Sequence, residues 1–323
     1  MSQNAMDEFA LIDTYFKRPE LAPMQTSITG IGDDCALLTI PEGMQLAQSL
    51  DTLVEGVHFP RHCDPELLGY RALAVTLSDL AAMGAEPHSF SLGLTLPAID
   101  KGWLQGFSDG LSKLAQIATI PLVGGDTTKG PLTLSLHVQG LVPVGKALKR
   151  SGAQVGDKIH VSGHLGDGAG ALDFVLKGDK PETVKNDHVR SLLRKYYTPM
   201  PRLALGQWLR DNGATAALDI SDGLLGDLGH ILTASGVGAR LNPEAVPCSS
   251  ALIAICGQKK ATQLAMGGGD DYELCFTWPD RPLVNVPART GCPVTCIGEI
   301  TRVPGIWDAC SGLKISTASY THF

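Results

Sequence analysis

Apolar side chains along the first half of the chain recur at two different spacings. In some stretches they lie three and four residues apart, as in helices with one buried face, and these are residues 8–18, 65–84 and 103–118. In others they form short runs bounded by Gly, Pro or Asp, as in strands, and these are residues 44–50, 89–96, 120–123 and 132–144. The first half is therefore predicted to mix helices and strands.

A change in composition separates this half from the rest. Residues 150–157, Arg-Ser-Gly-Ala-Gln-Val-Gly-Asp, are mostly Gly and polar residues and predict a boundary between two domains, residues 1–150 and 151–323. Beyond it the same criteria predict strands at residues 158–162, 214–218 and 272–277 and helices at residues 202–212 and 224–235. We predict two domains that each mix α and β, which suits a chain of 323 residues.

The charge and the cysteines argue against several classes of protein. A formal net charge of -7 and a pI near 5.7 disfavour nucleic acid or an anionic membrane as a partner, because both need clustered Lys and Arg. No apolar run reaches the roughly 18 residues of a membrane-spanning helix, and residues 1–14 lack the basic start and apolar stretch of a signal peptide. The eight cysteines are scattered without C-x-x-C pairs, which favours reduced thiols in a cytoplasmic protein.

Aspartates recur where a predicted apolar segment stops or a glycine turn begins. They are Asp33, Asp34, Asp51, Asp126, Asp219, Asp222, Asp270 and Asp271. None has a Lys or Arg within two residues, so a cluster of them needs another source of positive charge, and carboxylate oxygens favour Mg2+. Glycines at positions 124, 125 and 223 leave backbone N–H groups open to an anion such as phosphate. Asp and Gly are also ordinary turn and cap residues, which is the alternative interpretation of each motif taken alone.

The common ATP-binding motifs are absent from the sequence. It contains no G-x-x-x-x-G-K-[ST] loop, no G-x-G-x-x-G between a strand and a helix, and no protein-kinase H-R-D set. Residues 163–170, Gly-His-Leu-Gly-Asp-Gly-Ala-Gly, come nearest, but they lack the Lys-Ser or Lys-Thr that follows a phosphate loop. We predict a close-packed turn there.

Several segments, in their order along the chain, resemble the thiamine-phosphate kinase family. They are residues 30–36 (Gly-Ile-Gly-Asp-Asp-Cys-Ala), 49–58 (Ser-Leu-Asp-Thr-Leu-Val-Glu-Gly-Val-His), 77–85 (Leu-Ser-Asp-Leu-Ala-Ala-Met-Gly-Ala), 123–128 (Val-Gly-Gly-Asp-Thr-Thr), 219–223 (Asp-Ile-Ser-Asp-Gly) and 271–275 (Asp-Tyr-Glu-Leu-Cys). The resemblance covers nearly the whole chain, and the joint occurrence of the motifs is specific where each one alone is weak.

The resemblance implies a fold and an activity. The family belongs to the aminoimidazole ribonucleotide synthetase-like superfamily, whose members use ATP without a Walker loop and have two α+β domains. By this resemblance residues 1–150 form an ATP- and magnesium-binding domain that pairs in a homodimer, and residues 151–323 complete the ATP and substrate site. The implied reaction is ATP-dependent, in-line phosphorylation of thiamine monophosphate to thiamine diphosphate, the last step of thiamine diphosphate biosynthesis. Its nucleophile is a phosphate oxygen that is already deprotonated, so no catalytic base is assigned.

The resemblance also implies roles for individual residues. The magnesium ligands are Asp34, Ser49, Asp51, Asp79, Asp126, Asp219 and Asp222. The ATP contacts are Gly125, Asp126, Arg150 and Ser221. The substrate contacts are His58, Asp270 and Thr317. Taken without the resemblance, His58 is a structural histidine, Ser221 a helix cap, Arg150 a linker cation, Ser49 strand filler and Asp79 a partnered polar group inside a helix.

Two positions depart from the family's pattern. Many members have Glu at the position of Asp270 and an aromatic residue at the position of Thr317. The first difference shortens a substrate contact and the second removes a stacking face, so both bear on substrate affinity.

Other functions remain open from the residues alone. Another ATP-using synthetase of the superfamily is one. However, the chain lacks the reactive Cys or selenocysteine of selenophosphate synthetase and the Lys of its glycine-rich N-terminal loop, and it ends in Phe323, not in the cysteine of the hydrogenase maturation protein. A haloacid-dehalogenase-like phosphatase is another, suggested by Asp51-Thr-Leu-Val but lacking the second Asp two residues on. A non-catalytic ATP-binding or scaffold protein is the alternative outside the enzymes.

Overall fold

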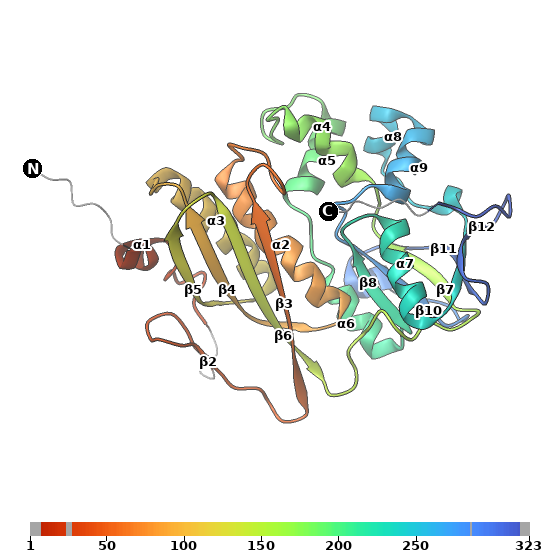
Figure 1. Cartoon of the computed structure of the whole chain (residues 1–323), viewed down its shortest axis with the longest axis horizontal. Helices are drawn as coiled ribbons and strands as arrows, with labels where there is room; N and C mark the ends of the chain where they lie inside the picture. The colour runs from red at the N-terminus through yellow and green to blue at the C-terminus, as the bar shows by residue number, and fades with distance from the viewer. Residues whose placement is uncertain (1–7, 24–27, 285, 317–323) are drawn as a thin grey trace, which may run out of the picture. The chain divides into compact units, whose positions relative to one another are not determined.

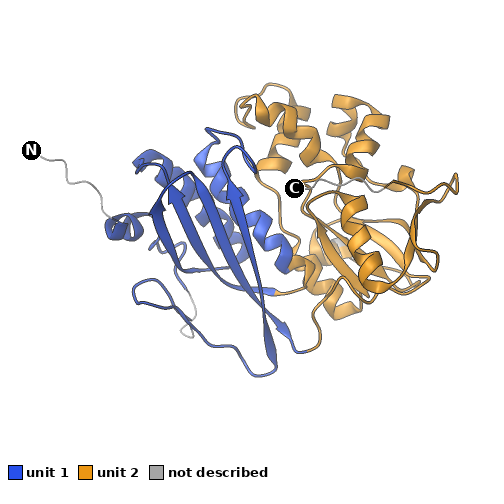
Figure 2. Cartoon of the chain, viewed as in Figure 1, with its two compact units in different colours: residues 1–80, 86–144 blue, residues 81–85, 145–323 orange. Residues whose placement is uncertain are grey.

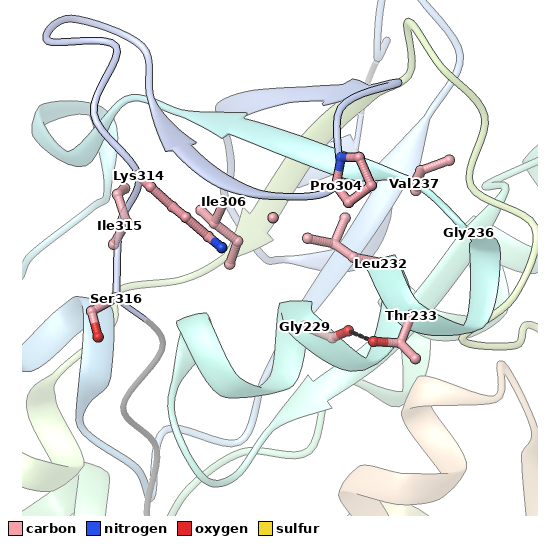
Figure 3. Close-up of a pocket in the computed structure, with 11 residues that line it drawn as sticks. Gly229, Leu232, Thr233, Gly236, Val237, Pro304, Ile306, Lys314, Ile315 and Ser316 are labelled. Atoms are coloured by element: carbon pink, nitrogen blue, oxygen red, sulfur yellow. Dashed lines mark hydrogen bonds between the residues drawn. The ribbon is translucent and has the colours of Figure 1, made fainter.

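The computed structural model divides the chain into two compact units (Figures 1 and 2). Unit 1 comprises residues 1–80 and 86–144, and unit 2 comprises residues 81–85 and 145–323. The structure describes residues 8–23, 28–284 and 286–316. Both units combine a sheet with helices, so the prediction of an α+β protein is confirmed.

Unit 1 is built on a four-stranded sheet of order β3-β6-β4-β5. The strands are β3 (Met44–Val54), β4 (Glu86–Leu96), β5 (Leu122–Lys129) and β6 (Thr133–Pro143). β6 pairs antiparallel with β3 and β4, and β5 pairs parallel with β4. The parallel pair is connected through helix α3 (Lys101–Ala118), as a crossover between parallel strands requires.

Two long helices, α2 (Pro65–Ala82) and α3, cover one face of this sheet (Figure 1). They approach closely, because a Cβ added at Gly110 would lie 1.8 Å from the backbone oxygen of Glu66. Leu134 and Leu136 of β6 face the helices and are fully buried, in the alternation expected for a strand with one covered face. The short elements α1 (Glu8–Tyr15), β1 (Ile28–Thr29) and β2 (Leu37–Leu38) complete unit 1.

Unit 2 contains a six-stranded sheet of order β12-β9-β11-β7-β10-β8. The strands are β7 (Lys158–Ser162), β8 (Ala216–Ile220), β9 (Gly238–Leu241), β10 (Glu273–Trp278), β11 (Val294–Thr301) and β12 (Gly305–Asp308). All neighbours pair antiparallel except β12 and β9, which pair parallel. Because β7 and β8 both run antiparallel to β10, their C-terminal ends lie beside the start of β10 at one edge of the sheet.

Helices bury both faces of this sheet. α7 (Leu224–Ser235) packs against one face in an apolar cluster that includes Leu218 and Leu228, and α6 (Leu203–Asn212) packs against the other with Leu209 and Phe276. The remaining helices are α4 (Asp167–Leu176), α5 (Asp187–Tyr197), α8 (Ser250–Cys256), α9 (Gln258–Gly267) and α10 (Val286–Thr290), with a 3-10 turn at Pro243–Ala245. α4, α5, α8 and α9 pack on one another. No helix within the described ranges has the length and apolar character needed to cross a membrane.

Some predicted strand ends were wrong. Asp51, Asp126 and Asp219 were placed at the ends of apolar segments, but they lie inside β3, β5 and β8. The polar residues continue each ladder because backbone pairing extends past the apolar run: Asp51 pairs with Leu136, and Asp126 pairs with Gly93.

Candidate active site

The structure brings together three of the predicted metal ligands in unit 1. Ser49 and Asp51 lie two residues apart on β3, and Asp79 lies on α2. The Ser49 hydroxyl donates a hydrogen bond to Asp79 Oδ2 at 2.5 Å. Burial, and to a lesser extent the Asp79 carboxylate, together raise the pKa of Asp51 to about 6, against a hydrogen bond with Thr76 that lowers it. Asp51 and Asp79 are thus close enough to repel each other.

Two other predicted ligands of unit 1 are exposed and separate. Asp126 lies on β5, which β6 and β4 separate from β3, and Asp34 lies in a turn where its N–H donates to Asp33 Oδ1. Among the described residues, no group of three or more His, Cys, Asp or Glu side chains is placed to hold a metal ion. A Cβ added at Gly125 would lie 1.9 Å from the backbone oxygen of Leu92, so the packing of β5 on β4 by itself requires glycine there.

In unit 2 the segment of residues 219–223 comprises the last two residues of β8 and the turn that joins β8 to α7. Asp227, in the first turn of α7, folds back over it: its Oδ2 accepts the N–H groups of Ser221, Asp222 and Gly223, each at 3.1 Å. The expectation that Gly223 leaves its N–H open to an anion was therefore wrong. The pKa of Asp227 is raised to about 6, mainly by burial and also by the Asp222 carboxylate, while the three N–H bonds oppose the rise.

Asp227 was not among the residues predicted from the sequence. The signal was its place in the first turn of a helix that begins after a glycine. Gly223 has no side chain with which to cap that helix.

A second turn, residues 268–272, lies against the first. The N–H of Asp270 donates to the Ser221 carbonyl and the N–H of Tyr272 donates to the Ile220 carbonyl, both at 2.8 Å. A Cβ added at Gly269 would lie 2.5 Å from the Ser221 oxygen, so the backbones are in contact. The structure thus brings Asp270, predicted to contact the substrate, beside the predicted ligand turn.

Asp270 and Tyr272 both have left-handed backbones, with φ of 67° and 49°. This conformation is costly for residues other than glycine and is often found at functional sites. The Tyr272 hydroxyl donates to Asp270 Oδ1 at 3.1 Å, which orients that carboxylate.

The backbone of the glycine-rich segment 163–170 is hydrogen-bonded by a buried carboxylate of the protein. The Asp271 carboxylate accepts the Gly166 N–H at 2.8 and 2.9 Å and the Gly168 N–H at 3.4 Å, at the start of α4. Burial raises the pKa of Asp271 well above its ordinary value, against the two glycine N–H bonds. A Cβ at Gly168 would lie 2.3 Å from the Asp270 backbone oxygen. The prediction of a close-packed turn is confirmed for residues 163–166, whereas residues 167–170 form the start of α4.

A buried ion pair lies at the same edge of the sheet. Glu273 is 2% exposed and accepts hydrogen bonds from Ser162 Oγ at 2.5 Å and from Arg202 Nε at 2.6 Å, with a second bond from Arg202 Nη2. Lys195 Nζ lies 3.4 Å from Glu273 Oε1. Neither Arg202 nor Lys195 was predicted from the sequence, because nothing in the local pattern links either residue to a position on β10.

The remaining predicted site residues are His58, Arg150 and Thr317. His58 Nδ1 accepts the Val54 N–H at 3.0 Å, which keeps Nδ1 unprotonated and fits the structural alternative considered for this histidine. Arg150 is exposed, and its carbonyl accepts a bond from Ser235 Oγ at 3.3 Å. Thr317 lies outside the described residues.

Comparison with known proteins identifies the family. Residues 32–142 and 154–306 match the models of the AIR synthase related protein N-terminal and C-terminal domains. The chain is 46% identical over 325 residues to the thiamine-monophosphate kinase of Salmonella typhimurium, covering 99% of each chain. It is 33% identical to the enzyme of that name from Bacillus subtilis, covering 91% of each. The chain belongs to the thiamine-monophosphate kinase family.

Solved structures agree with membership of the thiamine-monophosphate kinase family. The enzyme from Stenotrophomonas maltophilia is 43% identical, with a TM-score of 0.85 over 90% of this chain and 93% of that one. AaThiL complexed with AMPPCP and TMP is 29% identical, with a TM-score of 0.79 over 100% of this chain and 99% of that one. The resemblance stated from the sequence motifs is thereby confirmed.

The unit 1 group suits the magnesium ion expected in a thiamine-monophosphate kinase. Two neighbouring carboxylates raise the cost of each other's ionisation, and a divalent cation removes that cost. Magnesium in kinases is commonly held by one or two carboxylates together with substrate phosphates, with no need for a cage made only of protein groups. Asp51, Asp79 and the Ser49 hydroxyl supply such a partial set of hard oxygen ligands.

Proposed function

We infer that this protein transfers the γ-phosphoryl group of ATP to the phosphate of thiamine monophosphate, giving thiamine diphosphate and ADP. The observation that carries this inference is 46% identity to a thiamine-monophosphate kinase over 99% of both chains. AaThiL shares this fold at a TM-score of 0.79, and its structure contains both AMPPCP and TMP. AMPPCP is an analogue of ATP, and TMP is the abbreviation of the expected acceptor, thiamine monophosphate.

The protein's part in this reaction is positioning and charge balance. The acceptor phosphate oxygen is deprotonated at neutral pH, so the reaction needs no general base. Magnesium, when bound, neutralises phosphate charge and aligns the two phosphates. We propose that Ser49, Asp51 and Asp79 hold such an ion in unit 1, and that the other expected ligands are Asp34, Asp126, Asp219 and Asp222. The ordered hydroxyl of Ser49 supports this role, because it is already aimed at Asp79.

The substrate contacts are proposed on the same basis. Gly125, Arg150 and Ser221 are the ATP contacts, and His58, Asp270 and Thr317 are the thiamine monophosphate contacts. Asp270 has the strongest support, because its backbone is strained and its carboxylate is held by the Tyr272 hydroxyl.

Unit 1 also carries the proposed dimer surface. On β3, Leu46 and Leu50 are 40% and 60% exposed on the sheet face opposite α2 and α3. Exposed leucines on a sheet face are commonly covered by a partner, and we propose a second copy of the chain. No disulfide bond joins cysteines in the described ranges, which supports a cytoplasmic location.

Chromatographic product analysis tests the proposed reaction. Purified protein with ATP and Mg2+ is expected to convert thiamine monophosphate to thiamine diphosphate, with one ADP released per product. Thiamine serves as the matched control, because it has the same ring system without the acceptor phosphate. Equal phosphorylation of thiamine, or no turnover of either compound, refutes the assignment.

A further inference from the structure

We propose that Asp227 is a positioning residue that holds the segment of residues 219–223, the end of β8 and the turn after it, in the shape its metal ligands require. This inference rests on the proposed function, in which Asp219 and Asp222 are magnesium ligands. Asp227 itself is not proposed to contact the metal or the substrates.

The geometry of the contact is the first argument. One carboxylate oxygen of Asp227 accepts three successive backbone N–H groups, those of Ser221, Asp222 and Gly223, each at 3.1 Å. Hydrogen bonds to a charged acceptor are roughly twice as strong as neutral ones, and Asp227 is only 5% exposed, so water competes little. The path of the backbone on both sides of Asp222 is therefore fixed by this one side chain.

The second argument is what these bonds exclude. Successive N–H groups before a helix commonly bind phosphate in nucleotide-binding proteins. Here the N–H groups of residues 221–223 are occupied by a carboxylate of the protein itself. The turn therefore binds a phosphate through its side chains and the metal they hold. The placement of those side chains determines the affinity of the turn for phosphate.

The third argument is that the effect of Asp227 extends to the second turn. The carbonyl of Ser221, whose N–H is bonded to Asp227, accepts the Asp270 N–H, and the carbonyl of Ile220 accepts the Tyr272 N–H. A shift of the first turn therefore moves the backbone that presents Asp270. One buried carboxylate sets both a proposed metal contact and a proposed substrate contact.

Binding of Mn2+ in the presence of AMPPCP, followed by electron paramagnetic resonance, tests this role without turnover. Asp227→Asn keeps the size of the side chain but removes its charge. Residues that orient metal ligands typically change metal affinity about 10- to 100-fold when altered, and we expect Mn2+ binding to weaken by that factor. Steady-state kinetics should show the Mg2+ concentration for half-maximal activity rising in the same proportion.

Asp157→Asn is the matched control. Asp157 is also 5% exposed in unit 2 and accepts the Gln154 N–H and the Thr215 hydroxyl, but it lies just before β7, at the other edge of the sheet. Both variants should lose thermal stability, and only Asp227→Asn should lose Mn2+ affinity. Unchanged Mn2+ binding in Asp227→Asn, or equal weakening in both variants, overturns the proposal.

A second variant covers the case in which Asp227→Asn does not fold. Asp227→Glu keeps the charge and moves the oxygens by one methylene, and it should weaken Mn2+ binding at least about threefold, since ligand positioning is sensitive to such shifts. Affinity equal to that of the wild type then overturns the proposal. Wild-type protein that makes no thiamine diphosphate overturns the proposed function instead, so the two failures are distinguishable.

Discussion

Replacing Arg202 with Met should destabilise unit 2, because it leaves the buried carboxylate of Glu273 without its main charged partner. The Arg202 guanidinium is the main partner of Glu273, to which it donates through Nε at 2.6 Å and through Nη2. Glu273 is 2% exposed, so its carboxylate has no access to bulk water when Arg202 is removed. Met fills a similar volume and supplies no charge, so the variant isolates the electrostatic part of the contact.

The size of the effect follows from what remains around Glu273. Removing one partner of a buried ion pair typically costs about 3–5 kcal/mol. Ser162 Oγ at 2.5 Å and Lys195 Nζ at 3.4 Å still contact the carboxylate, so we expect the lower end, about 3 kcal/mol. For a folding unit of this size each kcal/mol lowers Tm by about 2–4 °C, which gives a fall of about 6–12 °C.

Urea unfolding followed by tryptophan fluorescence measures this change. Trp208 and Trp278 stack at 5.5 Å between ring centroids within unit 2 and report its unfolding. Combining Arg202→Met with Glu273→Leu removes both charges and should recover most of the lost stability, because apolar replacement of a buried pair is often neutral or stabilising. A single variant within about 1 kcal/mol of the wild type, or a double variant as unstable as the sum of two singles, refutes the reasoning.

Three further predictions concern turnover, assembly and pH. Asp126→Asn should lower turnover by a factor of roughly 10^2 to 10^3 with folding intact, because this is the scale for loss of one preorganised charge. Near-normal activity of the folded variant excludes Asp126 as a metal ligand. The wild type should scatter light with about twice the 34.1 kDa chain mass, and Leu50→Asp, on the exposed face of β3, should lower that mass towards one chain; a wild type already at one chain mass contradicts the dimer. Burial lowers the pKa of His160 from 6.5 to about 4, so the unfolded state binds the extra proton and the free energy of unfolding falls as pH drops from 6.5 towards 4. At pH 5 this amounts to about 2 kcal/mol, which His160→Phe should remove from the pH profile; parallel profiles for the two proteins would contradict the assignment.

The local sequence pattern was sufficient to predict an element when the residues of that element themselves show the spacing or the motif. The spacing of apolar residues predicted α2, although its residues 68–78 are buried on every side, and α7, which has one buried face, begins and ends at the predicted residues. The motif Asp219-Ile-Ser-Asp-Gly223 also predicted the turn that contains Ser221 and Asp222, whereas Asp219 lies inside β8.

Contacts between distant segments were beyond such reasoning. The bond from Ser49 to Asp79 joins residues 30 positions apart, and that between Arg202 and Glu273 spans 71 positions. Periodicity determines which face of a strand or helix is apolar, but it does not determine which polar group on another element lies opposite. The family resemblance, not spacing, linked Ser49 to Asp79.

The errors came from treating polar residues and glycines as stop signals. Asp126 lies inside β5 because β4 supplies pairing partners as far as Lys129, and an edge strand tolerates polar side chains. Gly223 donates its N–H to Asp227 four residues later, a contact that requires the helix to be formed first. In both cases a contact with another segment, β4 or Asp227, outweighed the usual local preference of Asp or Gly.

The glycines at the edge of the unit 2 sheet limit how this enzyme can be redesigned. The backbones of the turns around Gly168, Gly223 and Gly269 touch one another with no room for a methyl group: an added Cβ would lie 2.3, 2.9 and 2.5 Å from the nearest atoms. An insertion or a bulkier residue in any one turn therefore displaces its neighbour. A library aimed at a new acceptor should leave these backbones unchanged and vary the side chains they present, beginning with Asp270.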